Sequence, residues 1–175
     1  MALESLDIQN KLQETFGDHV KYFRSEYDML VLEADVDVVY NVIKFLKEEP
    51  SLNFNFLTDL CGVHYPDSDV NEQFCVVYHL HNWYENKRIR VKTFLNGSNP
   101  EVKSVISLFN CANWMERETF DFYGIIFEGH PNLVRILNMD EMTSFPMRKE
   151  FPMEDSGRTD KDDRFFGRTI NNSTI

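Results

Sequence analysis

Apolar side chains recur along this chain with two periods, one typical of helices and one typical of strands. A period close to 3.6 residues runs through residues 3–16 and 36–48, which predicts two amphipathic helices. Apolar and polar positions alternate in residues 74–81 and 87–95, which predicts the two strands of an antiparallel hairpin. Shorter apolar runs predict three further strands, at residues 19–25, 28–34 and 54–64.

Polar residues before two apolar runs suit the first turn of a helix. Asp35 or Asp37 is expected to cap the helix at 36–48, because a short carboxylate can accept hydrogen bonds from the free amides of a first turn. Asn99 and Pro100 suit the cap and the first position of another helix. The buried stripe of that helix would be Val102, Val105, Ile106 and Phe109.

The order helix, two strands, helix, three strands predicts a two-layer α+β domain with a mixed sheet over residues 1–137. The C-terminal helix of this domain ends at Gly124, and an extended arm follows the domain. The helices at 3–16 and 36–48 would cover one face of the sheet. From residue 138 no period survives, and we expect 138–175 to be a partner-binding arm, disordered or weakly ordered over 154–175. The C-terminal helix and the arm are expected to lie outside the core and to face partners.

Composition excludes several classes of protein. The formal net charge is −11 and the isoelectric point is about 4.8, which argues against nucleic acid or anionic lipid as the main partner. No apolar run approaches the roughly 20 residues of a membrane helix, so direct membrane insertion is not expected. The three cysteines are scattered, so we expect no iron–sulfur cluster or zinc site on this chain.

One predicted strand carries a basic stripe in this acidic protein. Arg88, Arg90 and Lys92 share one face of the strand at 87–95. The stripe is either a solvated sheet face, a docking site for an acidic partner, or the counterpart of the carboxylates at 116–121.

The densest mixture of charges and aromatic rings precedes Gly124, a residue that can end a helix in the left-handed conformation. Arg117 and Asp121 stand four residues apart and can pair, and Glu118 lies on the same face as Asp121. Three interpretations remain: a solvated acidic helix end, a contact surface that meets cations from elsewhere, and an acid/base pair.

These residues also resemble the signature of a known family, the thirty-kilodalton subunit of proton-pumping NADH:quinone oxidoreductase (respiratory complex I). The resemblance covers most of residues 54–152. It is carried by residues 60–63, 65–66, 76–80, 112–114, 116–118, 121, 124, 127–131, 133, 135–137 and 148–152.

The resemblance implies a non-catalytic structural subunit of the peripheral arm. Such a subunit holds the cofactor-bearing subunits in register for electron transfer from NADH to quinone. Its partners would be the quinone-site subunit and the subunit that carries the last cluster, on the cytoplasmic side of the cell membrane. Flavin and iron–sulfur clusters would belong to partner subunits. The implied partner-binding residues are Arg117, Glu118, Asp121, His130, Arg135, Arg148 and Lys149.

Three alternatives remain open. The same module could serve a related membrane-bound hydrogenase, or the chain could be a free-standing adaptor. In a different class, it could be a stand-alone acid/base enzyme that uses Glu116, Glu118, Asp121 and His130.

Overall fold

The computed structural model describes residues 5–27 and 29–151. Three α-helices and seven strands follow one another in this part of the chain, together with two short 3-10 turns at Gly17–His19 and Val70–Glu72. In order, the elements are α1 (Ser5–Phe16), β1 (Val20–Glu26), β2 (Met29–Ala34), α2 (Val39–Glu48), β3 (Phe56–His64), β4 (Phe74–Asn82), β5 (Lys87–Leu95), β6 (Glu101–Lys103), α3 (Ala112–Tyr123) and β7 (Ile126–Glu128).

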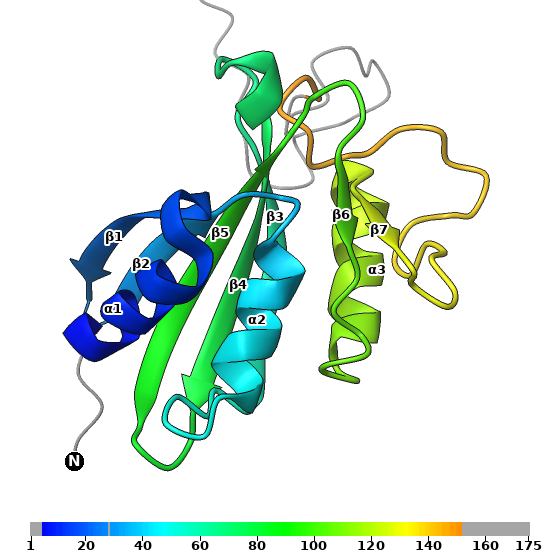
Figure 1. Ribbon diagram of the computed structural model, residues 1–175. Helices are drawn as coiled ribbons and strands as arrows, with labels where there is room; N and C mark the ends of the chain where they lie inside the picture. Colours follow the sequence, from blue (N-terminus) through cyan, green and yellow to red (C-terminus); the bar gives the residue numbers. More distant parts are fainter. Residues whose placement is uncertain (1–4, 28, 152–175) are drawn as a thin grey trace, which may run out of the picture.

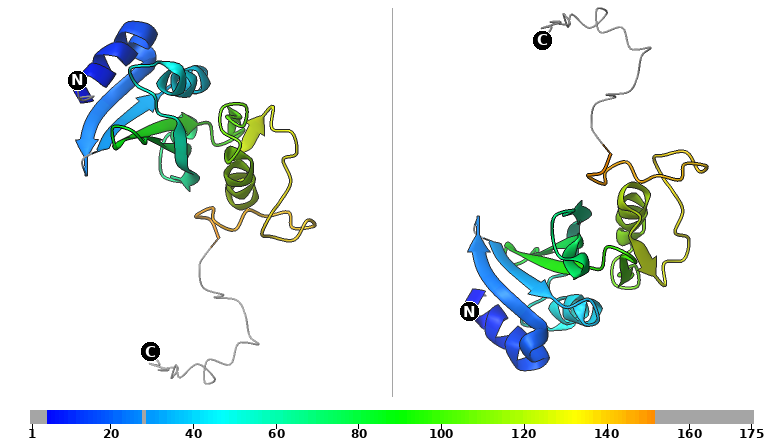
Figure 2. Two further views of the ribbon diagram at one scale, coloured as in Figure 1. Left: turned by 90° about the horizontal axis from the view of Figure 1, so that it is seen from below. Right: turned by 90° about the horizontal axis from the view of Figure 1, so that it is seen from above.

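A five-stranded mixed sheet forms the centre of the fold, in the order β1-β2-β5-β4-β3 (Figure 1). Strands β2 and β5 are parallel, whereas the other neighbours are antiparallel. Helices α1 and α2 lie on the same face of this sheet (Figures 1 and 2). The α+β prediction is confirmed, including the two helices and the five strands from which it was built.

Alternation along β4 explains how this sheet acquires its core. Phe74, Val76, Tyr78 and Leu80 point to the helix-covered side and are almost fully buried. Helix α2 adds the predicted stripe of Val39, Val42, Ile43 and Leu46. Burying each of these large apolar side chains stabilises the fold by roughly 1.5–3 kcal/mol relative to leaving it in water.

The predicted side-chain cap of α2 is wrong. The backbone carbonyl of Asp35, not its carboxylate, accepts hydrogen bonds from the amides of Val38 and Val39, at 3.1 and 3.0 Å. The Asp35 carboxylate instead lies 3.0 Å from His19 and 3.4 Å from Lys21. His19 and Lys21 lie at the start of β1, and the pairing of β1 with β2 brings them next to Asp35. Local helix-start signals do not reveal such a contact.

The helix predicted after Asn99 is also wrong, although Val102, Val105 and Phe109 of its apolar stripe are buried and Ile106 is half-buried. Residues 101–103 form β6, which pairs in parallel with β7 across α3 and so builds a strand–helix–strand unit. The Pro100 carbonyl accepts a hydrogen bond from the Ile126 amide at 2.8 Å. The strand conformation of residues 101–103 depends on their pairing with β7, which lies more than twenty residues later. A local sequence pattern therefore cannot predict it.

Helix α3 belongs to the core, contrary to the expectation that it lies outside. Ala112 of α3 belongs to the same continuous apolar cluster as the sheet, and Met115 and Tyr123 of this helix pack against that cluster. At Gly62 of β3, an added Cβ would lie 2.9 Å from the Thr119 methyl group and 2.7 Å from the Tyr123 ring. Glycine therefore lets α3 approach the strand backbone directly.

The arm is described as far as residue 151. Residues 138–151 form no helix or strand and run past α3 (Figure 1). The prediction for residues 154–175 lies outside the described residues. Within the described ranges, no helix is both long and apolar enough to span a membrane.

Candidate functional site: a clamp between α3 and the arm

Asp121 is the centre of a buried polar cluster that joins α3 to the arm. One carboxylate oxygen accepts hydrogen bonds from the backbone amides of Ile136, Leu137 and Asn138, at 3.1, 2.8 and 2.9 Å. The other oxygen accepts from the Arg135 guanidinium at 2.7 Å and from the Asn138 side chain at 3.1 Å. We call Asp121, Arg135 and Asn138 the clamp.

The clamp keeps Asp121 ionised although its side chain is fully buried. Burial acts to raise the pKa of this carboxyl group, because the charged form loses its water. Hydrogen bonds from the Asn138 and Leu137 amides and from the side chains of Arg135 and Asn138 outweigh that effect. The pKa of Asp121 is therefore held well below its usual value.

Arg135 extends the clamp along the arm. Its second terminal nitrogen donates to the carbonyls of Met142 and Ser144, at 2.6 and 3.0 Å. The guanidinium also stacks 5.0 Å from the Phe145 ring. Through Arg135, the Asp121 carboxylate on α3 is thus connected to Met142, Ser144 and Phe145 of the arm.

Arg117 does not form the expected pair with Asp121. Its guanidinium donates to the carbonyls of Val134 and Arg135, at 3.1 and 2.9 Å, and lies 5.2 Å from the Trp114 ring. Glu118 is exposed on α3 and makes no ion pair among the described residues. Arg117 therefore supports the entry to the arm, whereas Glu118 is available at the surface.

His130 holds the turn after β7. Its Nε2 lies 3.2 Å from the Asn113 carbonyl, and its Nδ1 accepts a hydrogen bond from the Asn132 amide at 3.1 Å. Since Nδ1 accepts, the proton resides on Nε2, which donates to Asn113. The imidazole therefore ties the turn to the first residues of α3.

Arg148 and Lys149 attach the far end of the described arm. The Arg148 guanidinium donates to the Tyr123 carbonyl at 2.7 Å and lies 4.7 Å from the Phe145 ring. The Lys149 amide donates to Nδ1 of His64 at 2.9 Å, while the Lys149 side chain is exposed. At Gly124, whose φ is +73°, an added Cβ would lie 2.6 Å from the Phe145 ring and 2.7 Å from the Arg148 guanidinium.

Glu116 is the second buried carboxyl group of α3, and it faces the opposite way, into the core. Its oxygens accept hydrogen bonds from the Ser104 hydroxyl at 2.6 Å and from the Val105 amide at 2.8 Å. Desolvation dominates over these two neutral donors and raises the pKa of Glu116 to about 7. The hydroxyl of Tyr78, close enough to feel the Glu116 charge, is buried and has no hydrogen-bond partner among the described residues.

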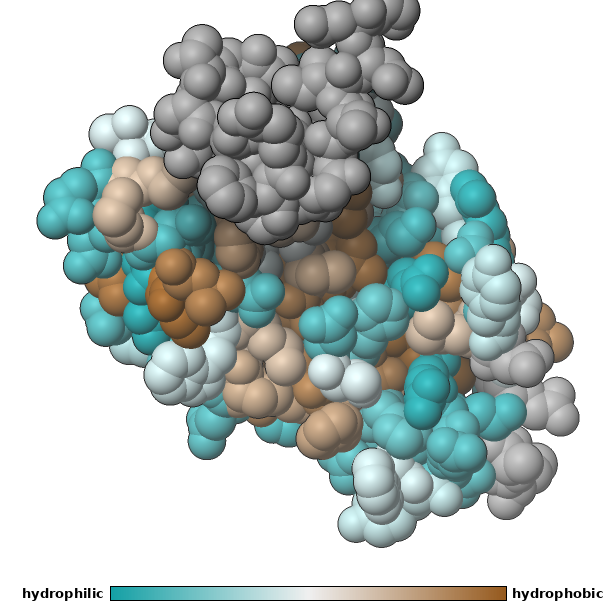
Figure 3. Space-filling model, turned by 180° about the vertical axis from the view of Figure 1, so that it is seen from behind, coloured by the Kyte–Doolittle hydropathy of each residue, from teal (hydrophilic) through white to brown (hydrophobic). Residues whose placement is uncertain are grey.

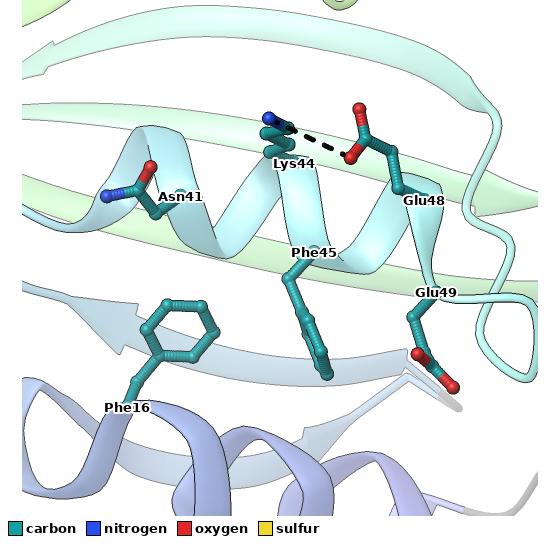
Figure 4. A pocket seen from close by; sticks show the side chains of 6 residues that line it. All are labelled: Phe16, Asn41, Lys44, Phe45, Glu48 and Glu49. Carbon is teal, nitrogen blue, oxygen red and sulfur yellow. Dashed lines mark ion pairs between the residues drawn. The ribbon is translucent and has the colours of Figure 1, made fainter.

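The four groups of the acid/base alternative do not converge on one substrate site. Glu116 points into the core, Asp121 is bound to the arm, His130 holds a turn and Glu118 faces solvent. A groove of about 370 Å³ lies elsewhere, between α1 and α2, where the Phe16 ring points toward α2 (Figure 4). Its charged residues include Lys44 and Glu48, which lie 3.9 Å apart on the helix surface.

The sequence singled out most of these positions but missed several of the residues that they contact. Asn138, Phe145, Ser104 and His64 were not singled out, and no local signal marks them. In the described part of the chain, no group of three or more His, Cys, Asp or Glu side chains is arranged to hold a metal ion.

The chain is similar to a known family over most of its length. Residues 32–157 match the family described as "Respiratory-chain NADH dehydrogenase, 30 Kd subunit". A protein of Rhizobium etli, named as a subunit of NADH-quinone oxidoreductase, is 41% identical over 154 residues, which cover 87% of this chain and 80% of that protein. A protein of Roseiflexus, also named as a subunit of NADH-quinone oxidoreductase, is 37% identical over 171 residues, 95% of each chain.

Two solved structures share the fold. A trypsin-resistant fragment of Nqo5, residues 1–134, superposes with a TM-score of 0.60 at 29% identity, covering 72% of this chain and 98% of the fragment. A chain of the archaeal membrane-bound sulfane sulfur reductase superposes with a TM-score of 0.70 at 23% identity, covering 85% of each chain. The second likeness is one of fold alone.

Proposed function

Because this chain belongs to the family of the 30-kDa subunit of the respiratory-chain NADH dehydrogenase, we propose that it is a non-catalytic structural subunit in the peripheral arm of a proton-translocating NADH:quinone oxidoreductase. The observation that carries the structural role is the clamp. It uses a buried carboxylate and a cation of the same chain to fix an irregular segment in one shape.

The clamped arm and the residues that lead into it, 134–137, present large apolar side chains to their surroundings. Leu137 is 66% exposed and Met139 is 73% exposed, although both lie within a few residues of Arg135. Val134, Met147 and Phe151 are exposed as well. Exposed apolar side chains concentrated on one ordered segment are typical of a protein–protein contact surface.

The residues that anchor the arm and the residues at the surface have different tasks in this proposal. Asp121, Arg135, Arg148, Arg117 and His130 shape the contact surface from within, since their polar atoms already bind this chain. Glu118 and Lys149 are exposed and would meet groups of the neighbouring subunits directly. The task of the chain is then to hold those subunits in register.

The partners we propose are the quinone-site subunit and the subunit that carries the last iron–sulfur cluster. Flavin and clusters would reside on those and other subunits, and the complex would lie at the cytoplasmic side of the cell membrane. Electron transfer depends on fixed distances between cofactors, so a rigid contact surface suits the role.

The test is assembly of the complex in cells that carry the double variant Leu137→Glu/Met139→Glu. We expect the yield of cofactor-bearing subunits that copurify with the tagged chain from detergent-solubilised membranes to fall about tenfold, because two charges would be buried at the contact. The matched control is Leu6→Glu on α1, which is 63% exposed and far along the chain from the arm.

Partners are identified by mass, and thermal unfolding of each purified variant checks that the chain itself still folds. Normal assembly with full NADH:quinone activity in the double variant would refute the role of the arm. Copurification with subunits of a different complex would refute the proposed assembly.

A further inference from the structure

The face of the sheet opposite α1 and α2 carries charged and aromatic side chains that the clamp does not use. We call it the open face. Its side chains on β5, β4 and β3 stand in four rows: Phe94–Cys75–Val63, Lys92–Val77–Cys61, Arg90–His79–Asp59 and Arg88–His81–Phe56. Figure 3 looks at the molecule from this side and shows apolar residues near the middle, bordered by polar ones.

The open face carries more cations than direct ion pairs, although the Glu33 carboxylate lies close enough to Lys92 and Arg24 to be stabilised by their charges. Arg90 is satisfied within the face, since its Nε donates to His79 at 2.8 Å and a terminal nitrogen lies 3.6 Å from Glu26. Arg24, Arg88 and Lys92 make no ion pair of 4.0 Å or less among the described residues. These three cations stand out on a chain whose formal net charge is −11.

An aromatic cluster borders Arg88. Trp83 is 68% exposed and makes edge contacts with Phe56 and His81, at centroid distances of 6.3 and 5.6 Å. His81 is the direct cross-strand neighbour of Arg88. Tryptophan and arginine are the residues most often responsible for affinity at protein interfaces.

We propose that the open face docks a protein segment that presents carboxylates beside apolar side chains. The carboxylates would meet Arg24, Arg88 and Lys92, and an apolar side chain would pack on Trp83 and Phe56. A uniformly anionic surface, such as lipid headgroups or nucleic acid, fits less well, because Glu26, Glu33 and Asp59 lie among the cations and would repel it.

This docking site is separate from the clamp. Helix α3 approaches β3 at Gly62, which stands on the core side of the sheet with its cross-strand neighbour Val76. The inference extends the proposed function, since it places a second neighbouring protein on the side of the sheet opposite α1 and α2, where Arg24, Arg88 and Trp83 are exposed.

The experiment uses the full chain in its native host, with a photoreactive benzoylphenylalanine in place of Phe94. We expect one major cross-linked protein, with the attachment point in a segment that contains Asp or Glu beside apolar residues. The variant Arg88→Glu/Lys92→Glu should reduce this product about tenfold or more. Lys44→Glu/Lys103→Glu, which changes the net charge equally at exposed positions elsewhere, should change it by no more than about twofold.

Each other outcome overturns the proposal. Absence of a cross-linked protein, or a product equally abundant in both charge variants, would mean that the face is simply solvated. Loss of binding to phosphatidylglycerol vesicles, with no change in a protein product, would assign the face to lipid. A product formed with a second copy of this chain would mean self-association.

Failure here is distinguishable from failure of the proposed function. Copurification with NADH:quinone oxidoreductase subunits but no cross-link at position 94 would refute only the docking site. A charge-dependent cross-link to an acidic segment without those subunits would support the docking site and refute the proposed complex.

Discussion

Helix α3 contains two carboxyl groups that are equally buried, but the number and charge of their hydrogen-bond donors differ, and their pKa values shift in opposite directions. Glu116 and Asp121 each have no exposed surface. Asp121 meets a guanidinium, an amide side chain and three backbone amides, and its pKa is depressed. Glu116 meets one hydroxyl and one backbone amide, with no cation among its partners, and its pKa rises to about 7.

The comparison teaches that burial alone decides neither the charge nor the role of a carboxyl group. Desolvation favours the neutral form of both groups, but only at Asp121 are there enough donors to reverse its effect. Asp121 can therefore act as a permanent anion around which an irregular arm folds. Glu116 fills a polar gap between α3 and the segment after β6.

The largest expected effect comes from Asp121→Asn, which tests whether the arm requires the anion. An amide must place its NH₂ group either against the Arg135 guanidinium or against the three backbone amides, so donors would face donors. We expect a loss of about 3–5 kcal/mol in the free energy of unfolding, measured by urea denaturation at pH 7. Residues 133–151 should also become sensitive to limited proteolysis.

The matched control is Glu118→Gln, the same type of change at the exposed carboxylate one turn earlier. It should alter the free energy of unfolding by less than about 0.5 kcal/mol. Equal effects of the two variants would mean that the clamp contributes nothing particular, and that the pKa of Asp121 is not depressed by its partners.

The same change of carboxyl to amide should have the opposite sign at Glu116. A glutamine can accept from the Val105 amide and donate to the Ser104 hydroxyl oxygen, without burying a charge. At pH 8, where the folded protein must bury a carboxylate, Glu116→Gln should raise the free energy of unfolding by about 1–2 kcal/mol. Urea denaturation from pH 5 to pH 8 measures the difference.

The pH dependence follows from the direction of the shift. The pKa of Glu116 is about 7 in the folded protein against an ordinary value of 4.5, so the folded state binds the extra proton between these values. The contribution of Glu116 to stability is thus fully present below about pH 4.5 and is lost as the pH rises through about 7. The advantage of the glutamine variant should shrink toward pH 5, and a difference independent of pH would contradict the assignment.

Much of this fold, but little of this comparison, could be predicted from the sequence. Regular periods in α2, β4 and β5 express local geometry, so those elements were predicted correctly. β6 was missed because its strand conformation depends on pairing with β7. The partners of the two carboxyl groups were missed for the same reason, since Ser104 and Arg135 lie 12 and 14 residues away along the chain. Period-based signals do not extend to contacts of that kind.

The smallest expected effect is that of Arg117→Gln. It tests whether the counter-ion of Asp121 is Arg117, as the sequence suggested, or Arg135, as the structure shows. Arg117 stands one turn before Asp121, yet within residues 5–27 and 29–151 it donates only to the carbonyls of Val134 and Arg135. Arg117→Gln should therefore cost about 1 kcal/mol of unfolding free energy. Arg135→Gln should cost about 3–5 kcal/mol, because it leaves Asp121 buried without a counter-ion. In double-mutant cycles with Asp121→Asn, Arg117→Gln should be additive within about 0.5 kcal/mol, whereas Arg135→Gln should not be additive. The reverse pattern would make Arg117 the partner of Asp121, and the arm would then lack its anchor.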